Sequence, residues 1–146
     1  MTIKYKILLD YIKDLSVETP DAQSLITARE YISKYSLMID ITSKALKRKM
    51  IEVYTKLIYE DKITNKKNQT RSKKTNFEMV YATVISIEDE KPNPAELKKL
   101  ILCDLQIEIY PKIEKSFIGI LRLSGFPDLQ LKSKIDFNKL YNQSLS

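Results

Sequence analysis

The feature that most constrains the fold is a single apolar stripe in the stretch from Leu105 to Pro127. Its large side chains recur at the spacing of one helix face, namely Ile113, Phe117, Ile120 and Leu121. Pro111 suits a first helical turn, where its missing N–H has no partner, and Gly125-Phe126-Pro127 is a stop signal. The pattern predicts a helix from about Pro111 to about Ser124, and such a helix must lay its stripe on another element.

Four earlier segments alternate apolar and polar side chains with period two, which predicts β-strands. The first runs from Ile3 to Val17, with Lys13 as an exception on the apolar face and with Leu8 and Ile12 interrupting the polar face. The other three are Tyr35–Ile41, Ile51–Tyr59 and Phe77–Ile87, whereas residues 22–34 are ambiguous and could hold a short helix. Sequential strands joined by turns favour an antiparallel meander.

The second half of the chain carries helix signals. Asn93-Pro94-Ala95-Glu96 places a cap residue, a proline at the first helical position and a glutamate at the third. Leu97, Leu100, Ile101 and Leu105 share a face behind that start, and Tyr110-Pro111 either bends this helix into the long one or separates the two. A last short helix is predicted to start at Asp136. Because strands come first and helices second, we predict an α+β fold: a four-stranded antiparallel meander sheet with two or three helices packed on one face. A chain of 146 residues can form one such domain, residues 1–146.

The composition argues against an enzyme. The chain has no histidine, the usual general base and the commonest metal ligand, and its two glycines, Gly119 and Gly125, cannot form a phosphate-cradling loop. The single cysteine, Cys103, falls in an apolar helical run and is expected to be a small buried hydrophobe. We therefore expect no catalytic residue, no cofactor site and no metal site.

Nothing in the sequence indicates a membrane span or a signal peptide. No run of about 18 apolar residues is present, and the amino terminus lacks the charged and then apolar pattern of a secretory signal. We therefore expect a cytoplasmic protein.

The formal charge of +6 has one main source. The run from Lys62 to Lys74 contains six basic residues and no acidic one, so the rest of the chain is formally neutral. Such a run is typical of a solvated connection, and its functional interpretation is an electrostatic handle for phosphates or acidic segments.

The apolar faces of the fourth strand suggest more than one cover. Val80, Ala82 and Val84 occupy one face of this strand, and the other face carries Phe77, Met79 and Tyr81. Helices that pack on one side of the sheet can cover only one of these two faces. Our hypothesis is that an identical subunit covers the second face or the sheet edge, with Phe77, Met79 and Tyr81 as the subunit interface.

One segment is specific enough to suggest a family. Residues 11–22 read YIKDLSVETPDA, which is similar to the amino-terminal signature Y-x-K-D-[IL]-S-x-E-x-P-x-A of SecB, the bacterial protein-export chaperone family. The family's order and spacing also match at Glu52-Val53, Tyr81-Ala82, Tyr110-Pro111, Gly125-Phe126-Pro127, Ile135-Asp136-Phe137 and Leu140-Tyr141. The chain therefore resembles SecB over nearly its whole length.

The resemblance implies a function and a set of site residues. It implies a homotetramer, built as a dimer of dimers, that holds unfolded precursor proteins and passes them to the SecA motor. Binding of the unfolded state needs exposed apolar grooves and no catalytic group. The resemblance places a preprotein-binding groove at Leu37, Ile39, Ile41, Phe117, Phe137, Leu140 and Tyr141, and a SecA contact at Asp14, Glu18 and Glu78.

Two alternatives stay open at this point. The first is a nucleic-acid-binding module that uses the basic run and exposed tyrosines such as Tyr5 and Tyr54. Against it, the basic charge sits in one loop and does not form a stripe across a sheet face. The second keeps the chaperone fold but gives it a dedicated client such as an antitoxin, since the extended segment from Glu88 to Leu105 also resembles the SecB-like chaperones of toxin–antitoxin systems.

Overall fold

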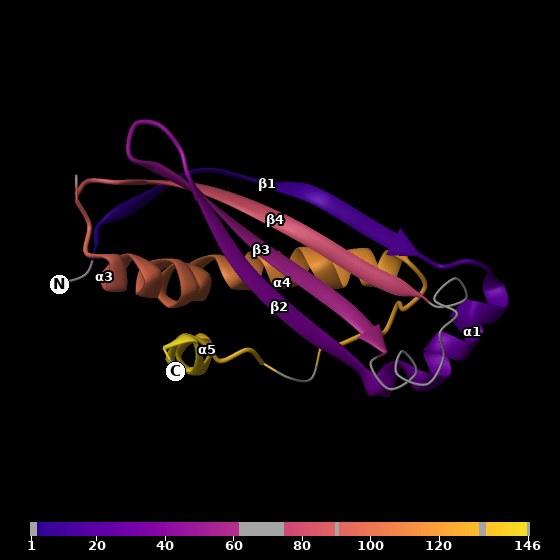
Figure 1. Ribbon diagram of the computed structural model, residues 1–146. Helices are drawn as coiled ribbons and strands as arrows, with labels where there is room; N and C mark the ends of the chain where they lie inside the picture. Colours follow the sequence, from indigo (N-terminus) through magenta and orange to yellow (C-terminus); the bar gives the residue numbers. More distant parts are fainter. Residues whose placement is uncertain (1–2, 62–74, 90, 132–133, 146) are drawn as a thin grey trace.

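A four-stranded antiparallel sheet with helices along one face forms the protein (Figure 1). The computed structural model describes residues 3–61, 75–89, 91–131 and 134–145. The strands are β1 (Tyr5–Glu18), β2 (Tyr35–Ala45), β3 (Met50–Asp61) and β4 (Asn76–Ile87), and the helices are α1 (Ala22–Tyr31), α3 (Pro94–Lys99), α4 (Leu105–Leu123) and α5 (Phe137–Ser144). The predicted α+β class is confirmed.

The strand order, β1-β4-β3-β2, differs from a simple meander at β1. Strands β2, β3 and β4 do follow one another. Strand β1, however, pairs with β4, because α1 and the 3₁₀ turn η1 (Ile32–Lys34) carry the chain across to the far edge before β2 begins. Both β1 and β2 are therefore edge strands. Most of the predicted basic loop, residues 62–74, lies outside the described residues.

Two bulges explain why the alternation in β1 is irregular. Ile7 pairs with Ile85 and Leu9 with Val84, so Leu8 is an extra residue without a partner on β4. Lys13 is the second extra residue, between Ile12 and Asp14, which pair with the neighbouring residues Tyr81 and Val80. Each extra residue moves the following side chains to the other face of the sheet. Leu9 and Tyr11 consequently lie on the face opposite the one that Tyr5 and Ile7 occupy.

The long helical segment begins earlier than the sequence predicts. The side chain of Asn93 caps α3 by accepting a bond from the Ala95 amide (2.8 Å), as its cap signal predicts. A π-helical turn, η3 (Leu100–Asp104), then joins α3 to α4, so Pro111 lies inside α4 and not in its first turn. Both Pro111 and Ile107 are exposed, so water can satisfy the Ile107 carbonyl that lacks its N–H partner. No helix among the described residues is long and apolar enough to cross a membrane.

The core lies between α4 and one face of the sheet, which we call the helix face. Every fourth residue of α4 is buried there: Leu105, Ile109, Ile113, Phe117 and Leu121. The same stripe buries Gln106, whose side-chain amide donates to the Thr55 hydroxyl (3.0 Å) and so leaves neither polar group unsatisfied.

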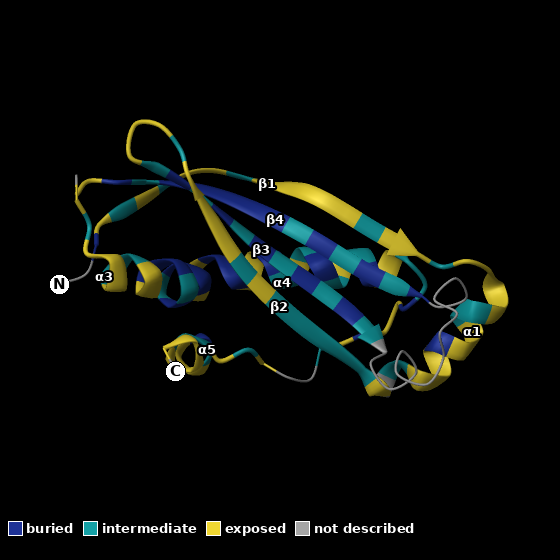
Figure 2. Ribbon diagram, in the orientation of Figure 1, coloured by how far each residue is buried: buried dark blue, intermediate teal, exposed yellow. Residues whose placement is uncertain are grey.

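The hypothesis about the subunit interface requires a correction. Phe77 and Met79 are 0% exposed and Tyr81 is 4% exposed, because they point into the chain's own core under the helices. On the other face of β4, Ala82 and Val84 are also buried, and Ala82 stands between Tyr11 of β1 and Tyr54 of β3. Six of the large apolar side chains that are exposed lie instead along β1, which Figure 2 shows mainly as an exposed strand.

Candidate functional groove

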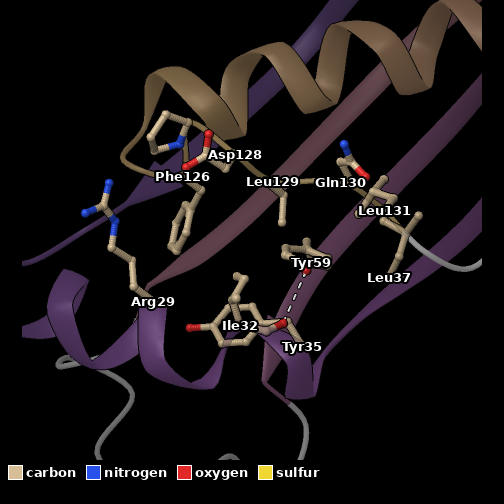
Figure 3. Close-up of a pocket in the computed structure, with 11 residues that line it drawn as sticks. Arg29, Ile32, Tyr35, Leu37, Tyr59, Phe126, Asp128, Leu129, Gln130 and Leu131 are labelled. Atoms are coloured by element: carbon tan, nitrogen blue, oxygen red, sulfur yellow. Dashed lines mark hydrogen bonds between the residues drawn. The ribbon is translucent and has the colours of Figure 1, made fainter.

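A cavity of about 660 Å³ lies beside the start of β2 on the helix face. Its walls come from three parts of the chain: the end of α1 with η1, the paired ends of β2 and β3, and the segment that follows α4 (Figure 3). The lining is mainly aromatic and aliphatic, and consists of Arg29, Ile32, Tyr35, Leu37, Tyr59, Phe126, Pro127, Asp128, Leu129, Gln130 and Leu131. Apolar walls with a few polar groups are typical of a site that binds by burial of apolar surface.

Specific contacts hold the aromatic wall of this cavity. The rings of Tyr35 and Tyr59 lie 5.4 Å apart at 47°, and the Tyr59 hydroxyl donates to the Ile32 carbonyl (3.5 Å). The Tyr35 hydroxyl pairs with the Thr75 hydroxyl. Burial, with a smaller contribution from neighbouring Tyr35, raises the pKa of the Tyr59 phenol.

The opposite wall is anchored at Gly125. The Arg29 guanidinium of α1 donates through Nε to the Gly125 carbonyl (2.7 Å), which ties α1 to the turn after α4. Gly125 has a φ of 118°, and a side chain there would meet Leu25 at 2.7 Å. Only glycine fits both the left-handed backbone and the close approach of α1. The turn then directs Phe126 into the core, where its ring packs edge-on against Phe77.

A second cavity continues the same surface at the other end of β2. It measures about 290 Å³ and is lined by Ile41, Thr42, Ser43, Pro94, Leu97, Lys98, Ile101 and Leu102. Leu37 lines the first cavity and Ile41 the second, while half-buried Ile39 lies between them on the same face of β2. Because β2 is an edge strand, both cavities open beside a sheet edge that no other described strand pairs with. We call this surface the β2 groove.

The three acidic residues predicted as a SecA contact are brought together on the open face, the sheet face opposite the helices. Ser16 stands opposite Glu78, and Asp14 and Glu18 lie two residues to either side of Ser16 on β1. Asp14 and Glu18 are exposed, whereas Glu78 forms an ion pair with Lys56 (2.6 Å). Hydrogen bonding to Glu78 raises the pKa of the Lys56 amine. The cluster therefore keeps two carboxylates without an ion pair to another described residue.

Neither tyrosine of the nucleic-acid alternative is a free exposed ring. Tyr5 is half-buried and donates to Glu108 (3.1 Å), and burial together with that bond raises its pKa to about 12. Tyr54 donates to Glu52, as Tyr11 does, and the Lys13 amine lies 4.0 Å from the centre of the Tyr54 ring. Both rings are thus engaged within the chain.

The comparison with family models decides the family. Residues 2–146 match the model described as preprotein translocase subunit SecB. The chain belongs to the SecB family. A SecB-family protein of Pelagibacter ubique is 42% identical over 143 residues, with 98% of each chain covered. A protein-export protein SecB of Rickettsia bellii is 31% identical over 137 residues, with 93% of this chain and 84% of that one covered.

A solved structure supports the fold independently. The SecB-like chaperone of Mycobacterium tuberculosis, in complex with a ChAD peptide from an antitoxin, has a TM-score of 0.62 to this chain, with 90% of each chain covered. At 11% identity this likeness concerns the fold. The family match and the names of the relatives bear out the predicted role of an export chaperone.

The residues that the SecB resemblance assigned to the groove fall into two groups. Leu37, Ile39 and Ile41 lie along the β2 groove as described. Phe117 is 0% exposed and Phe137 is 5% exposed, with the Phe137 ring against Tyr110 at 5.2 Å, so both belong to the core and not to an accessible surface. Leu140 and Tyr141, on α5, are half-buried against that core.

Most of the large cavity's walls were missed from the sequence. Tyr35 and Tyr59 were assigned only to strands, and Phe126 only to a helix stop. Leu129 and Leu131 stand in a segment without helical or strand periodicity, and Ile32 lies in the stretch that was ambiguous. One signal was available in the sequence: apolar residues are frequent just after the helix stop at Gly125. A solvent-exposed connection would not need them, so they indicate a segment that packs against the fold.

Proposed function

We propose that this SecB-family chain is an export chaperone that holds unfolded precursor proteins in the β2 groove. The observation that carries the proposal is a cavity of about 660 Å³, lined mainly by aromatic and aliphatic residues, beside a sheet edge that no other described strand pairs with, continued by a second cavity along the same strand. An unfolded chain exposes apolar side chains and unpaired backbone together. A groove of this kind takes up both and keeps such segments from aggregating.

The spacing of the two cavities fits an extended client. Leu37 and Ile41 are four residues apart on β2, which corresponds to about 13 Å of strand. An extended client segment of four or five residues can therefore place one large side chain in each cavity. Burial of apolar surface has little directional preference, so many sequences would be accepted.

The first test changes one groove residue. We expect Leu37→Ser to weaken the binding of an unfolded precursor about tenfold, because it removes apolar surface from the large cavity. The measurement is the Kd for a fluorescently labelled, unfolded precursor, with the folded form of the same protein as the second ligand.

Met38→Ser is the matched control, since Met38 lies on the same strand and points to the open face. It should leave the Kd unchanged, and urea unfolding should show that both variants are folded. Equal Kd values for the parent chain and Leu37→Ser, or no preference for the unfolded ligand, would contradict the proposal. A chain that binds only one precursor or one antitoxin among many would instead support the dedicated-client alternative.

The proposal includes assembly into a homotetramer built as a dimer of dimers. Strand β1 is an unpaired edge with six exposed large apolar side chains, at Leu8, Leu9, Tyr11, Ile12, Leu15 and Val17. The outer side of α4 exposes Ile107 and Leu123 around Gly119, where nothing lies within 4 Å of an added Cβ. Two β1 edges paired across a two-fold axis would extend the sheet, and the outer sides of α4 would supply the second contact.

The proposal also includes delivery to SecA through the acidic cluster on the open face. Exposed carboxylates attract a basic partner segment and set its orientation. We expect the double variant Asp14→Lys, Glu18→Lys to bind SecA about tenfold more weakly in a pull-down titration at low salt. Its affinity for an unfolded precursor should not change.

Glu30→Lys, an exposed change on α1, is the charge control for this experiment. If the double variant retains the parent's affinity for SecA, the acidic cluster is not the contact.

A further inference from the structure

The hairpin between β2 and β3 carries a basic tip that the chaperone role does not explain. The turn is closed by bonds from the Leu46 amide to the Met50 carbonyl (2.8 Å) and from the Met50 amide to the Lys47 carbonyl (3.4 Å). Lys47, Arg48 and Lys49 form its exposed end. In Figure 1 this hairpin projects beyond the sheet at the end remote from α1.

The backbone of the tip makes the choice of residues unusual. Arg48 and Lys49 have φ values of 62° and 60°, the left-handed conformation in which Asn and Gly are preferred for a two-residue hairpin turn. A fold that needed only a tight turn would place small residues there. The side chains of Arg48 and Lys49 are instead long and cationic, so the turn carries charge at positions where its backbone favours small residues.

The charged residues of the tip itself are all basic. No carboxylate occurs between Thr42 and Ile51. Lys4 and Lys6, near the start of β1, add two further exposed cations at this end of the sheet. Among the described residues, the exposed acidic side chains at this end include Glu88, Asp89 and Glu108, and Glu108 accepts a bond from Tyr5. Lys49 donates to the backbone carbonyl of Glu88 (3.3 Å), which ties the tip to the end of β4. The hairpin itself, from Lys44 to Met50, carries four basic residues and no acidic one.

We propose that this tip docks on the phosphate headgroups of an anionic lipid bilayer. A convex tip with three adjacent cations can touch a flat anionic surface, whereas binding of a single-stranded nucleic acid also uses aromatic side chains on which bases stack. No aromatic residue occurs from Thr42 to Lys49, so the tip offers nothing on which a base could stack. Basic residues next to an anionic surface each add to the attraction, and salt weakens it.

The experiment measures binding to vesicles with the whole chain. The parent should co-sediment with vesicles of equimolar phosphatidylglycerol and phosphatidylcholine at low salt, and not with phosphatidylcholine vesicles. The triple variant Lys47→Gln, Arg48→Gln, Lys49→Gln should lower the partition coefficient about 100-fold. A second variant, Arg48→Asn with Lys49→Gly, removes two charges while giving the turn its preferred residues, so a loss of binding there cannot come from misfolding.

Lys115→Gln with Lys134→Gln and Lys139→Gln is the matched control, since it removes three exposed cations elsewhere and should bind vesicles like the parent. If the tip variants bind vesicles as well as the parent does, or the control loses as much binding, the proposal fails. It also fails if the parent binds polyuridylate through the tip but not the vesicles. Holding of unfolded precursor should be unchanged in the tip variants, so this result is independent of the groove.

Discussion

A Phe117→Ala variant is expected to lose about 3–5 kcal/mol of unfolding free energy, the usual cost of deleting a buried ring. Phe117 is 0% exposed and belongs to the stripe by which α4 packs on the sheet. Removing the ring leaves a cavity that the surrounding backbone can fill only in part. Urea unfolding followed by circular dichroism measures the loss, and Lys115→Ala, an exposed change on the same helix, should stay within about 0.5 kcal/mol of the parent.

This variant distinguishes a core role from a groove role for Phe117. If Phe117 lined the groove, the Phe117→Ala variant would bind clients more weakly while its unfolding curve stayed unchanged. If Phe117 belongs to the core, the variant should unfold at lower urea concentration. It should bind clients more weakly only under conditions where part of the population is unfolded. An unchanged unfolding midpoint together with weaker client binding would show that Phe117 is a groove residue.

The repeating patterns of the sequence marked the strands and two helix starts. Regular alternation marks β2, β3 and most of β4, and cap residues at Asn93 and Asp136 mark the starts of α3 and α5. These signals are local, since they depend on neighbours within one turn or one strand. The start of α4 stayed undecided because Pro111 resembles a first-turn proline, and the exposure of Ile107 and Pro111 to water makes the proline tolerable deeper in the helix.

The groove was only partly predictable for a different reason. β2 was recognised because Leu37, Ile39 and Ile41 alternate, but the large cavity also needs Arg29 of α1 to meet the Gly125 carbonyl, a contact between residues 96 positions apart. Likewise, the burial of Phe77 and Met79 depends on which face of β4 receives α4. Alternation shows that β4 has two different faces, but it does not say which of them the chain's own helices cover.

For strand β1 too, the sequence pattern does not say what covers its apolar side chains. The prediction with the largest effect on assembly concerns this strand. Ile12 and Leu15 both point to the helix face but lie at the sheet edge, and they are 44% and 43% exposed in the single chain. A long apolar edge strand left unpaired is an aggregation hazard, which soluble chains remove by covering or charging the edge. Since β1 carries little charge on this side, a second copy is the cover that we propose.

The double variant Ile12→Lys, Leu15→Lys should reduce the assembly to a dimer or smaller in sedimentation velocity at micromolar concentration. Across a two-fold axis each lysine would face the partner's lysines, so like charges would replace apolar contacts on both strands. The single chain should remain folded, because both side chains already have access to water. Ile26→Lys makes the same change on α1, where Ile26 is 52% exposed, and should leave the tetramer intact. A double variant that still sediments as a tetramer would show that β1 is not the interface and that the apolar edge is covered in another way.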